Sequence, residues 1–153
     1  MDYSRTGGKK AVEIGAGTGK ATAPMLNAGY DVTAVEMGAN MAEFIHDKFK
    51  HWDNFNVVVT DFESAVLPEN TYDLIYAASA FHWVDAGVGC PKVFRLLKNG
   101  GTFALFRNNA VPEDGNVLYE EIQAVYDKYY YRHYIISRDQ DRLEFLICHT
   151  RIF

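Results

Sequence analysis

The sequence has few cysteines, no basic cluster and no long apolar run, and each of these absences excludes a class of protein. Its two cysteines, Cys90 and Cys148, lack CxxC spacing, so we expect both to be reduced and buried and predict no metal site. A net charge of -5 without a basic cluster gives no attractive surface for nucleic acid. The first residues, MDYSRTGGKK, have no signal-peptide core, and no segment has the length of a membrane span. These absences favour a cytoplasmic protein that binds neither nucleic acid nor membrane.

Length and composition predict one folded domain. The 153 residues are 48% apolar and 23% charged, which is near ordinary globular usage, and they contain no low-complexity tract or internal repeat. We therefore expect a single domain over residues 1–153, with a core at 10–108 and a helical cap region and terminal strand at 109–153.

Short apolar runs alternate with segments of helical period, which is the pattern of a parallel sheet with crossover helices. Turn-forming residues bound each run, and the five predicted strands are AVEI at 11–14, DVTAVE at 31–36, NVVVT at 56–60, YDLIYAA at 72–78 and TFALF at 102–106. The segment 61–71 is short for a crossover, so we expect only one helical turn there.

Two helices have boundaries that the sequence predicts. Asn40 and Glu43 have the spacing of a capping box, and apolar residues follow at helical intervals: Met41, Phe44, Ile45, Phe49 and Trp52. A second helix is predicted to begin at Pro91 and to stop at Gly100. Its apolar face would hold Val93, Phe94 and Leu97. The first helix should pack on the sheet, and the second should lead directly into the fifth strand.

Three alternate glycines, Gly15, Gly17 and Gly19, follow the first strand. Glycine lacks the Cβ that would block a ligand and tolerates positive φ, so this bend suits close approach of a ligand to the backbone. A helix expected from about Lys20 would point its N–H groups at the same place, although an ordinary tight turn is the plainer alternative. Lys20 stands where the dinucleotide fingerprint needs a small residue, which makes a nicotinamide oxidoreductase the least favoured interpretation.

The stretch VEIGAGTGKAT resembles the first motif of class I S-adenosylmethionine-dependent methyltransferases, and further motifs follow in the family's order. These are AVE at the end of the second strand, TDFES after the third, YDLIYAASAFHWVD around the fourth and VFRLLKNGGTFALF around the fifth. The resemblance covers residues 10–108. It implies an α/β fold with a Rossmann-like, doubly wound, mostly parallel sheet of strand order 3-2-1-4-5, and it leaves open an antiparallel C-terminal strand. It also implies S-adenosylmethionine as cofactor and S-adenosylhomocysteine as product.

The resemblance assigns cofactor-binding residues to four segments. The full set is Glu13, Gly15, Ala16, Gly17, Thr18, Gly19, Glu36, Met37, Asp61, Phe62, Ala78, Ser79 and Phe81. Glu36 would hold the ribose hydroxyls, because one carboxylate can accept two charge-assisted hydrogen bonds. Asp61 would accept from the adenine amino group and Phe62 would pack on the ring, although the Asp could instead cap a helix and the Phe could belong to the core.

Glu13 and the segment after the fourth strand complete the predicted site. By resemblance, Glu13 orients the glycine loop or reaches the cofactor's amino group, whereas a lone acid in a strand could simply pair elsewhere. Residues from Ala78 to Phe81 would lie beside the methionine moiety. His82 is expected first to line the pocket, and the role of catalytic base is its alternative. Trp83 could face the substrate or belong to the core.

The sequence thus predicts an S-adenosylmethionine-dependent methyltransferase that acts on a small-molecule acceptor. A non-catalytic binding module or regulatory partner is the alternative, and the oligomeric state, monomer or dimer, stays open. A later segment has an apolar helical face that could form a substrate lid or could pack against the sheet or a partner subunit. This face comprises Leu118, Ile122, Val125, Tyr126, Tyr129 and His133.

Relatives in this family carry helices before the first strand and two further strands after the fifth. Only ten residues precede AVEI here, so either the protein is a natural minimal version of the family or the sequence joins ordered segments and omits others. We expect the second. The joins are expected near residues 3–9, 133–138 and 145–147.

Overall fold

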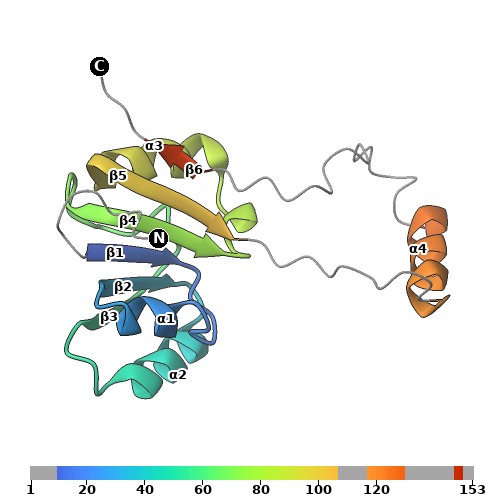
Figure 1. Ribbon diagram of the computed structural model, residues 1–153, viewed down its shortest axis with the longest axis horizontal. Helices are drawn as coiled ribbons and strands as arrows, with labels where there is room; N and C mark the ends of the chain where they lie inside the picture. Colours follow the sequence, from blue (N-terminus) through green and yellow to red (C-terminus); the bar gives the residue numbers. More distant parts are fainter. Residues whose placement is uncertain (1–9, 107–116, 130–146, 150–153) are drawn as a thin grey trace. The chain divides into compact units, whose positions relative to one another are not determined.

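A six-stranded sheet organises the larger of the two units into which the chain divides. The computed structural model describes residues 10–106, 117–129 and 147–149. One unit comprises Met1–Phe106 with Phe145–Phe153, and the other comprises Arg107–Glu144. The strands of the first unit lie in the order β3-β2-β1-β4-β5-β6 (Figure 1). They are β1 at Lys10–Ile14, β2 at Asp31–Glu36, β3 at Phe55–Val59, β4 at Tyr72–Ala78, β5 at Leu97–Phe106 and β6 at Ile147–His149.

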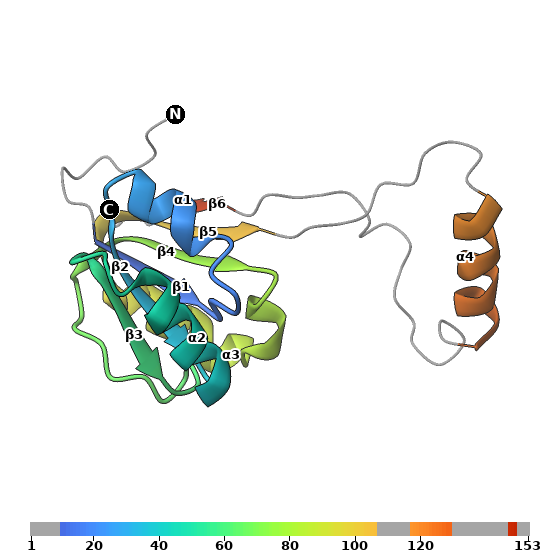
Figure 2. The ribbon, with the colours of Figure 1, turned by 90° about the horizontal axis from the view of Figure 1, so that it is seen from below.

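The first five strands are parallel, which confirms the predicted Rossmann-like order 3-2-1-4-5. Strand β1 is central, with Val12 opposite Thr33 of β2 and Ile75 of β4. Strand β6 runs antiparallel to β5. Figure 2 shows the strand direction turning progressively from β3 to β5, the twist expected of an open sheet.

Helices cover both faces of the sheet, as the alternation of side chains along the strands requires. Ala11 of β1 belongs to a core cluster with Leu26 of α1 (Thr22–Asn27) and Ile45 of α2 (Ala39–Phe49). Val12, the next residue of the same strand, belongs to a second cluster with Val93 of α3 (Ala86–Leu96). Two apolar layers therefore enclose β1, which explains its nearly continuous apolar sequence.

The expected capping box at the start of α2 is wrong. The N-cap residue is Gly38, no side chain caps the helix, and α2 begins at Ala39. Two of the predicted core residues, Ile45 and Phe49, are buried. Met41 and Phe44 are exposed instead, so the buried face of α2 is narrower than the sequence suggested.

Helix α3 begins before Pro91 rather than at it. Asp85 is the N-cap, and its carboxylate accepts the N–H of Gly87 at 2.7 Å, so Pro91 lies inside the helix. Phe94 is exposed, whereas Val93 is fully buried.

The predicted stop signal at Gly100 falls inside β5, which follows α3 directly. There the pairing with β4 shifts from Tyr72 opposite Leu97 to Leu74 opposite Thr102, and Gly100 has a positive φ of 79°. The glycine thus serves an irregularity of the strand rather than a helix end.

The connection between β3 and β4 contains the one helical turn that its length predicted. The N–H of Ala65 donates to the carbonyl of Asp61 at 3.1 Å, and the N–H of Ser64 donates to the Asp61 carboxylate at 2.7 Å. The predicted helix from Lys20 begins slightly later, at Thr22, after a turn at residues 17–21.

The second unit contains α4, Val117–Tyr129. Leu118, Ile122 and Val125 on its predicted apolar face are exposed. His133 and the predicted joins, except Ile147, lie outside the described residues. Within the described ranges, no helix is both long and apolar enough to cross a membrane. Cys90 is free but only half-buried, so the expectation of a buried thiol is wrong for this residue.

The position of Pro91 generates a stability prediction. A proline beyond the first turn of a helix removes a backbone hydrogen bond and crowds the preceding turn, so Pro91→Ala should raise the free energy of unfolding by about 1–3 kcal/mol. Urea denaturation measures the change. The matched control is Pro24→Ala, because Pro24 lies in the first turn of α1, where proline is tolerated. Equal effects of the two substitutions would contradict the placement of Pro91.

Candidate active site

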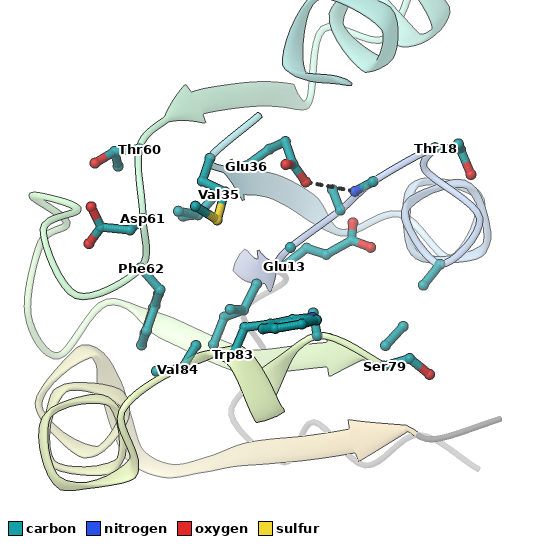
Figure 3. A pocket seen from close by; sticks show the side chains of 18 of the residues that line it. Glu13, Thr18, Val35, Glu36, Thr60, Asp61, Phe62, Ser79, Trp83 and Val84 are labelled. Carbon is teal, nitrogen blue, oxygen red and sulfur yellow. Dashed lines mark hydrogen bonds between the residues drawn. The ribbon is translucent and has the colours of Figure 1, made fainter. Parts of the chain in front are cut away.

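A cleft of about 780 Å³ opens at the carboxyl ends of β1, β2, β3 and β4. This is the edge of an open α/β sheet at which ligands bind, beside the point where the strand order reverses between β1 and β4. Figure 3 shows the side chains that enter it from these strand ends. The lining comprises Glu13, Ile14, Gly15, Ala16, Gly17, Thr18, Lys20, Ala21, Val35, Glu36, Met37, Thr60, Asp61, Phe62, Glu63, Ala78, Ser79, Ala80, Trp83 and Val84.

Most of the residues predicted from the sequence lie around this cleft. Gly19, Phe81 and His82 are the exceptions, since they are not among the lining residues. The sequence reasoning missed Thr60 and Glu63, although they flank Asp61 and Phe62 in the same TDFES segment. Their position directly after a strand was the available signal, because every residue that follows a parallel strand lies near this edge.

Glycine is needed at the three positions of the loop for different structural reasons. All have positive φ, at 67°, 52° and 71° for Gly15, Gly17 and Gly19. A Cβ on Gly15 would lie 2.5 Å from the Cβ of Ala80, and one on Gly19 would lie 2.4 Å from the Phe49 ring. A Cβ on Gly17 would meet no described atom within 4 Å. Only Gly17 therefore combines its turn with open space toward the cleft, whereas Gly15 and Gly19 permit close packing.

Glu36 joins the glycine loop to the start of α2. One carboxylate oxygen accepts the N–H of Gly17 and the other accepts the N–H of Gly38, both at 2.9 Å. The residue is 8% exposed and ends β2. Figure 3 shows its bond to Gly17 at the cleft. The carboxylate is thus fixed in position by two backbone donors from different elements.

Glu13 lies beneath the loop and is 1% exposed. Its Oε2 accepts the hydroxyl protons of Thr22 in α1 at 2.5 Å and of Tyr76 in β4 at 3.0 Å. Burial raises the pKa of Glu13 to about 7, and the charge of Glu36 adds to this, while the two hydrogen bonds oppose it. Burial and the adjacent Glu13 in turn raise the pKa of Tyr76. Glu13 therefore orients α1 against the sheet.

Asp61 and Phe62 lie on the wall of the cleft formed after β3. Asp61 is exposed and caps its own turn through Ser64, whose N–H holds the pKa of Asp61 below its usual value. Phe62 is 3% exposed and belongs to the core cluster while also lining the cleft. The capping role of Asp61 and the core role of Phe62 are therefore both present, and these contacts hold the two residues at the cleft.

In the segment after β4, Trp83 has a different environment from its neighbours Phe81 and His82. Trp83 lines the cleft and is 81% exposed, so it does not belong to the core. His82 is exposed and stacks at a tilt on Trp83 with 4.8 Å between ring centroids. Phe81 packs edge-on against Phe103 at 5.0 Å, which places it against the core.

Comparison with known families identifies this arrangement. A model of the methyltransferase domain matches residues 12–105, which is more than half of the chain. The chain belongs to this methyltransferase domain family. The match contains every element that forms the cleft.

Other methyltransferases resemble the chain in sequence or in fold. An uncharacterized methyltransferase from Mycobacterium tuberculosis (strain ATCC 25618 / H37Rv) is 31% identical over 100 residues, which are 65% of this chain and 40% of the relative. A Methanococcus maripaludis protein assigned as an S-adenosyl-L-methionine-dependent methyltransferase shares the fold, with a TM-score of 0.61 and 20% identity over 79% of this chain and 56% of that one.

A ligand-bound structure shares the same fold. Phosphoethanolamine N-methyltransferase 1 of Haemonchus contortus, in complex with phosphoethanolamine and S-adenosylhomocysteine, has a TM-score of 0.60 and 19% identity over 72% of this chain and 24% of that one. The chain matches 40% of the length of the M. tuberculosis relative, which is less than half.

The geometry of the loop predicts that replacing glycine by alanine has unequal effects on stability at positions 17 and 19. Gly17→Ala should lower stability by about 1–2 kcal/mol, since it adds only left-handed backbone strain. Gly19→Ala adds a clash with Phe49 and should cost about 1–3 kcal/mol more. Urea denaturation of both variants measures the difference. Phe49→Leu in the Gly19→Ala background should recover part of the loss, and equal losses in the two single variants would contradict the packing argument.

The environment of Glu13 predicts a pH-dependent stability. Because the pKa of Glu13 is raised by folding from 4.5 to about 7, its neutral form stabilises the folded state at low pH, and this contribution is lost as the pH rises through 7. Between pH 5.5 and 8, wild type should lose about 2 kcal/mol relative to Glu13→Gln, which mimics the neutral acid. Denaturation at several pH values tests this. A constant difference between the two proteins would show that Glu13 does not titrate in this range.

Proposed function

We propose that this chain catalyses S-adenosylmethionine-dependent methyl transfer to a small-molecule acceptor. The observation that carries the proposal is the Glu36 carboxylate, which two backbone amides hold at the edge of a cleft beside an open glycine. The family membership of residues 12–105 supports it. S-adenosylhomocysteine in the H. contortus enzyme supports the same cofactor class at the level of the fold.

The residues present fit this cofactor. A carboxylate offers about four lone-pair sites, and the backbone uses one on each Glu36 oxygen. The remaining sites can accept the two ribose hydroxyls. Asp61 can accept from the adenine amino group, and Phe62 presents an apolar surface beside it. Gly17 leaves the loop open to the cofactor because no described atom would meet its Cβ within 4 Å.

The protein's own contribution to the reaction is alignment. The bound cofactor supplies an activated methyl group on a sulfonium. Displacement at that methyl needs the acceptor in line with it, so fixed orientation supplies much of the rate. Ser79 and Trp83 line the side of the cleft formed after β4, where the acceptor would approach. Trp83 would exclude water and bind the acceptor, while His82 remains the candidate base and supports the Trp83 ring.

Parallel titrations with S-adenosylhomocysteine and NADH test the proposal. Wild type should bind S-adenosylhomocysteine and not NADH in calorimetry. Glu36→Gln should weaken S-adenosylhomocysteine binding by about 1.5–3 kcal/mol, because an amide replaces one accepting oxygen with a donor. The same exchange at Glu43, an exposed residue of α2 away from the cleft lining, is the matched control.

The stability of Glu36→Gln must be measured in parallel, because the amide also opposes one of the two backbone N–H groups. Binding should therefore be compared at a temperature at which both variants are folded. Preference for NADH, or equal affinity of the Glu36→Gln and Glu43→Gln proteins, would overturn the assignment. Transfer of a labelled methyl group to an acceptor then separates catalysis from binding alone.

A further inference from the structure

Helix α3 carries a lysine in an environment where lysine is rarely found. Lys92 is 8% exposed and faces the core side of α3 beside Val93. A buried ammonium requires bonded partners, because water no longer solvates it. The ion pairs of the described residues join Lys50, Arg95 and Lys98 to carboxylates, and Lys92 takes part in none of them.

The partners of Lys92 belong to the segment that follows β3. Its Nζ donates to the carbonyl of Glu63 at 2.9 Å and to the carbonyl of Ala65. The same ammonium lies 5.3 Å from the centroid of the Phe62 ring, within the range of a cation–π contact. One side chain of α3 thus contacts Phe62, Glu63 and Ala65, three residues of the segment that follows β3.

Charges of both signs surround Lys92. Burial, with help from Arg95, lowers the pKa of Lys92, while the carboxylates of Asp61 and Glu63 oppose this. Both carboxylates belong to the segment that Lys92 holds, and both residues line the cleft.

A second contact ties the same segment to the start of α3. The N–H of Asp85, the N-cap residue, donates to Oε1 of Glu63 at 2.9 Å. The turn therefore has anchors at both the beginning and the middle of one helix. The hydrogen bonds from Ser64 and Ala65 to Asp61 close the turn on itself and do not reach another element. The position of Asp61 and Phe62 relative to the cleft thus depends on α3.

We infer that Lys92 is a positioning residue that sets the selectivity of the cleft for a 6-aminopurine, by holding Asp61 and Phe62 against the adenine side. This inference rests on the proposed function. Lys92 is not among the residues that line the cleft. Its effect passes through the backbone carbonyls of Glu63 and Ala65, so it should appear in the discrimination between purines rather than in the binding of the amino-acid end.

The test compares S-adenosylhomocysteine with S-inosylhomocysteine, which has an oxygen in place of the 6-amino group. Wild type should bind S-adenosylhomocysteine at least tenfold more tightly. Lys92→Met, which keeps the length and apolar stem of the side chain, should reduce this ratio at least fivefold. Any loss of the Phe62 contact lowers both affinities and cancels in the ratio. Lys98→Met is the matched control, because Lys98 binds the buried Asp73 away from the cleft lining. Its ratio should equal that of wild type.

The outcomes separate the two proposals. Wild type that binds neither compound overturns the proposed function and this inference with it. A folded Lys92→Met protein with the wild-type ratio overturns only the role of Lys92. If Lys92→Met does not fold, Lys92→Gln decides, since its amide retains a donor for one carbonyl. An intermediate ratio for that variant supports the inference, and an unchanged ratio overturns it.

Discussion

The carboxylate of Glu36 is the interaction on which the geometry of the cleft depends. It ends β2 and binds one amide in the loop after β1 and another at the start of α2. Three chain segments are thereby held at one sheet edge by a single side chain. Because backbone donors already hold this carboxylate in position, little reorganisation energy is needed when a ligand binds. The same arrangement means that Glu36 contributes to the fold as well as to the site, so its substitution cannot be neutral for stability.

Two glutamates of the same sheet have different chemistry because of their surroundings. Glu36 receives two backbone N–H donors at the cleft, one on each carboxylate oxygen. Glu13 lies deeper, and burial raises its pKa to about 7 despite its hydrogen bonds to Thr22 and Tyr76. The buried acid therefore joins α1 to β4 beneath the glycine loop, while the more accessible one remains available to a ligand.

The helix starts that the sequence predicted wrongly share one physical cause. Capping-box spacing at Asn40 and proline at position 91 are local signals for helix starts, but the N-cap of α2 is Gly38 and α3 is capped by Asp85. Local preferences are worth only about 1 kcal/mol, and packing of a helix on a sheet outweighs them. The three glycines show the same limit, since Gly19 serves the contact with Phe49 and only Gly17 opens to the cleft.

The sequence by itself determined the strands, their parallel order through the family motifs, and the segments that meet at the cleft. Those features follow from residue periodicity and from motifs that lie close together in the chain. Tertiary structure alone decided that Tyr76 binds Glu13 across 63 positions, that Trp83 faces the cleft and that Lys92 holds the turn after β3. These contacts depend on how helices pack against strand ends, and side chains brought together from distant positions leave no periodic signal in one sequence.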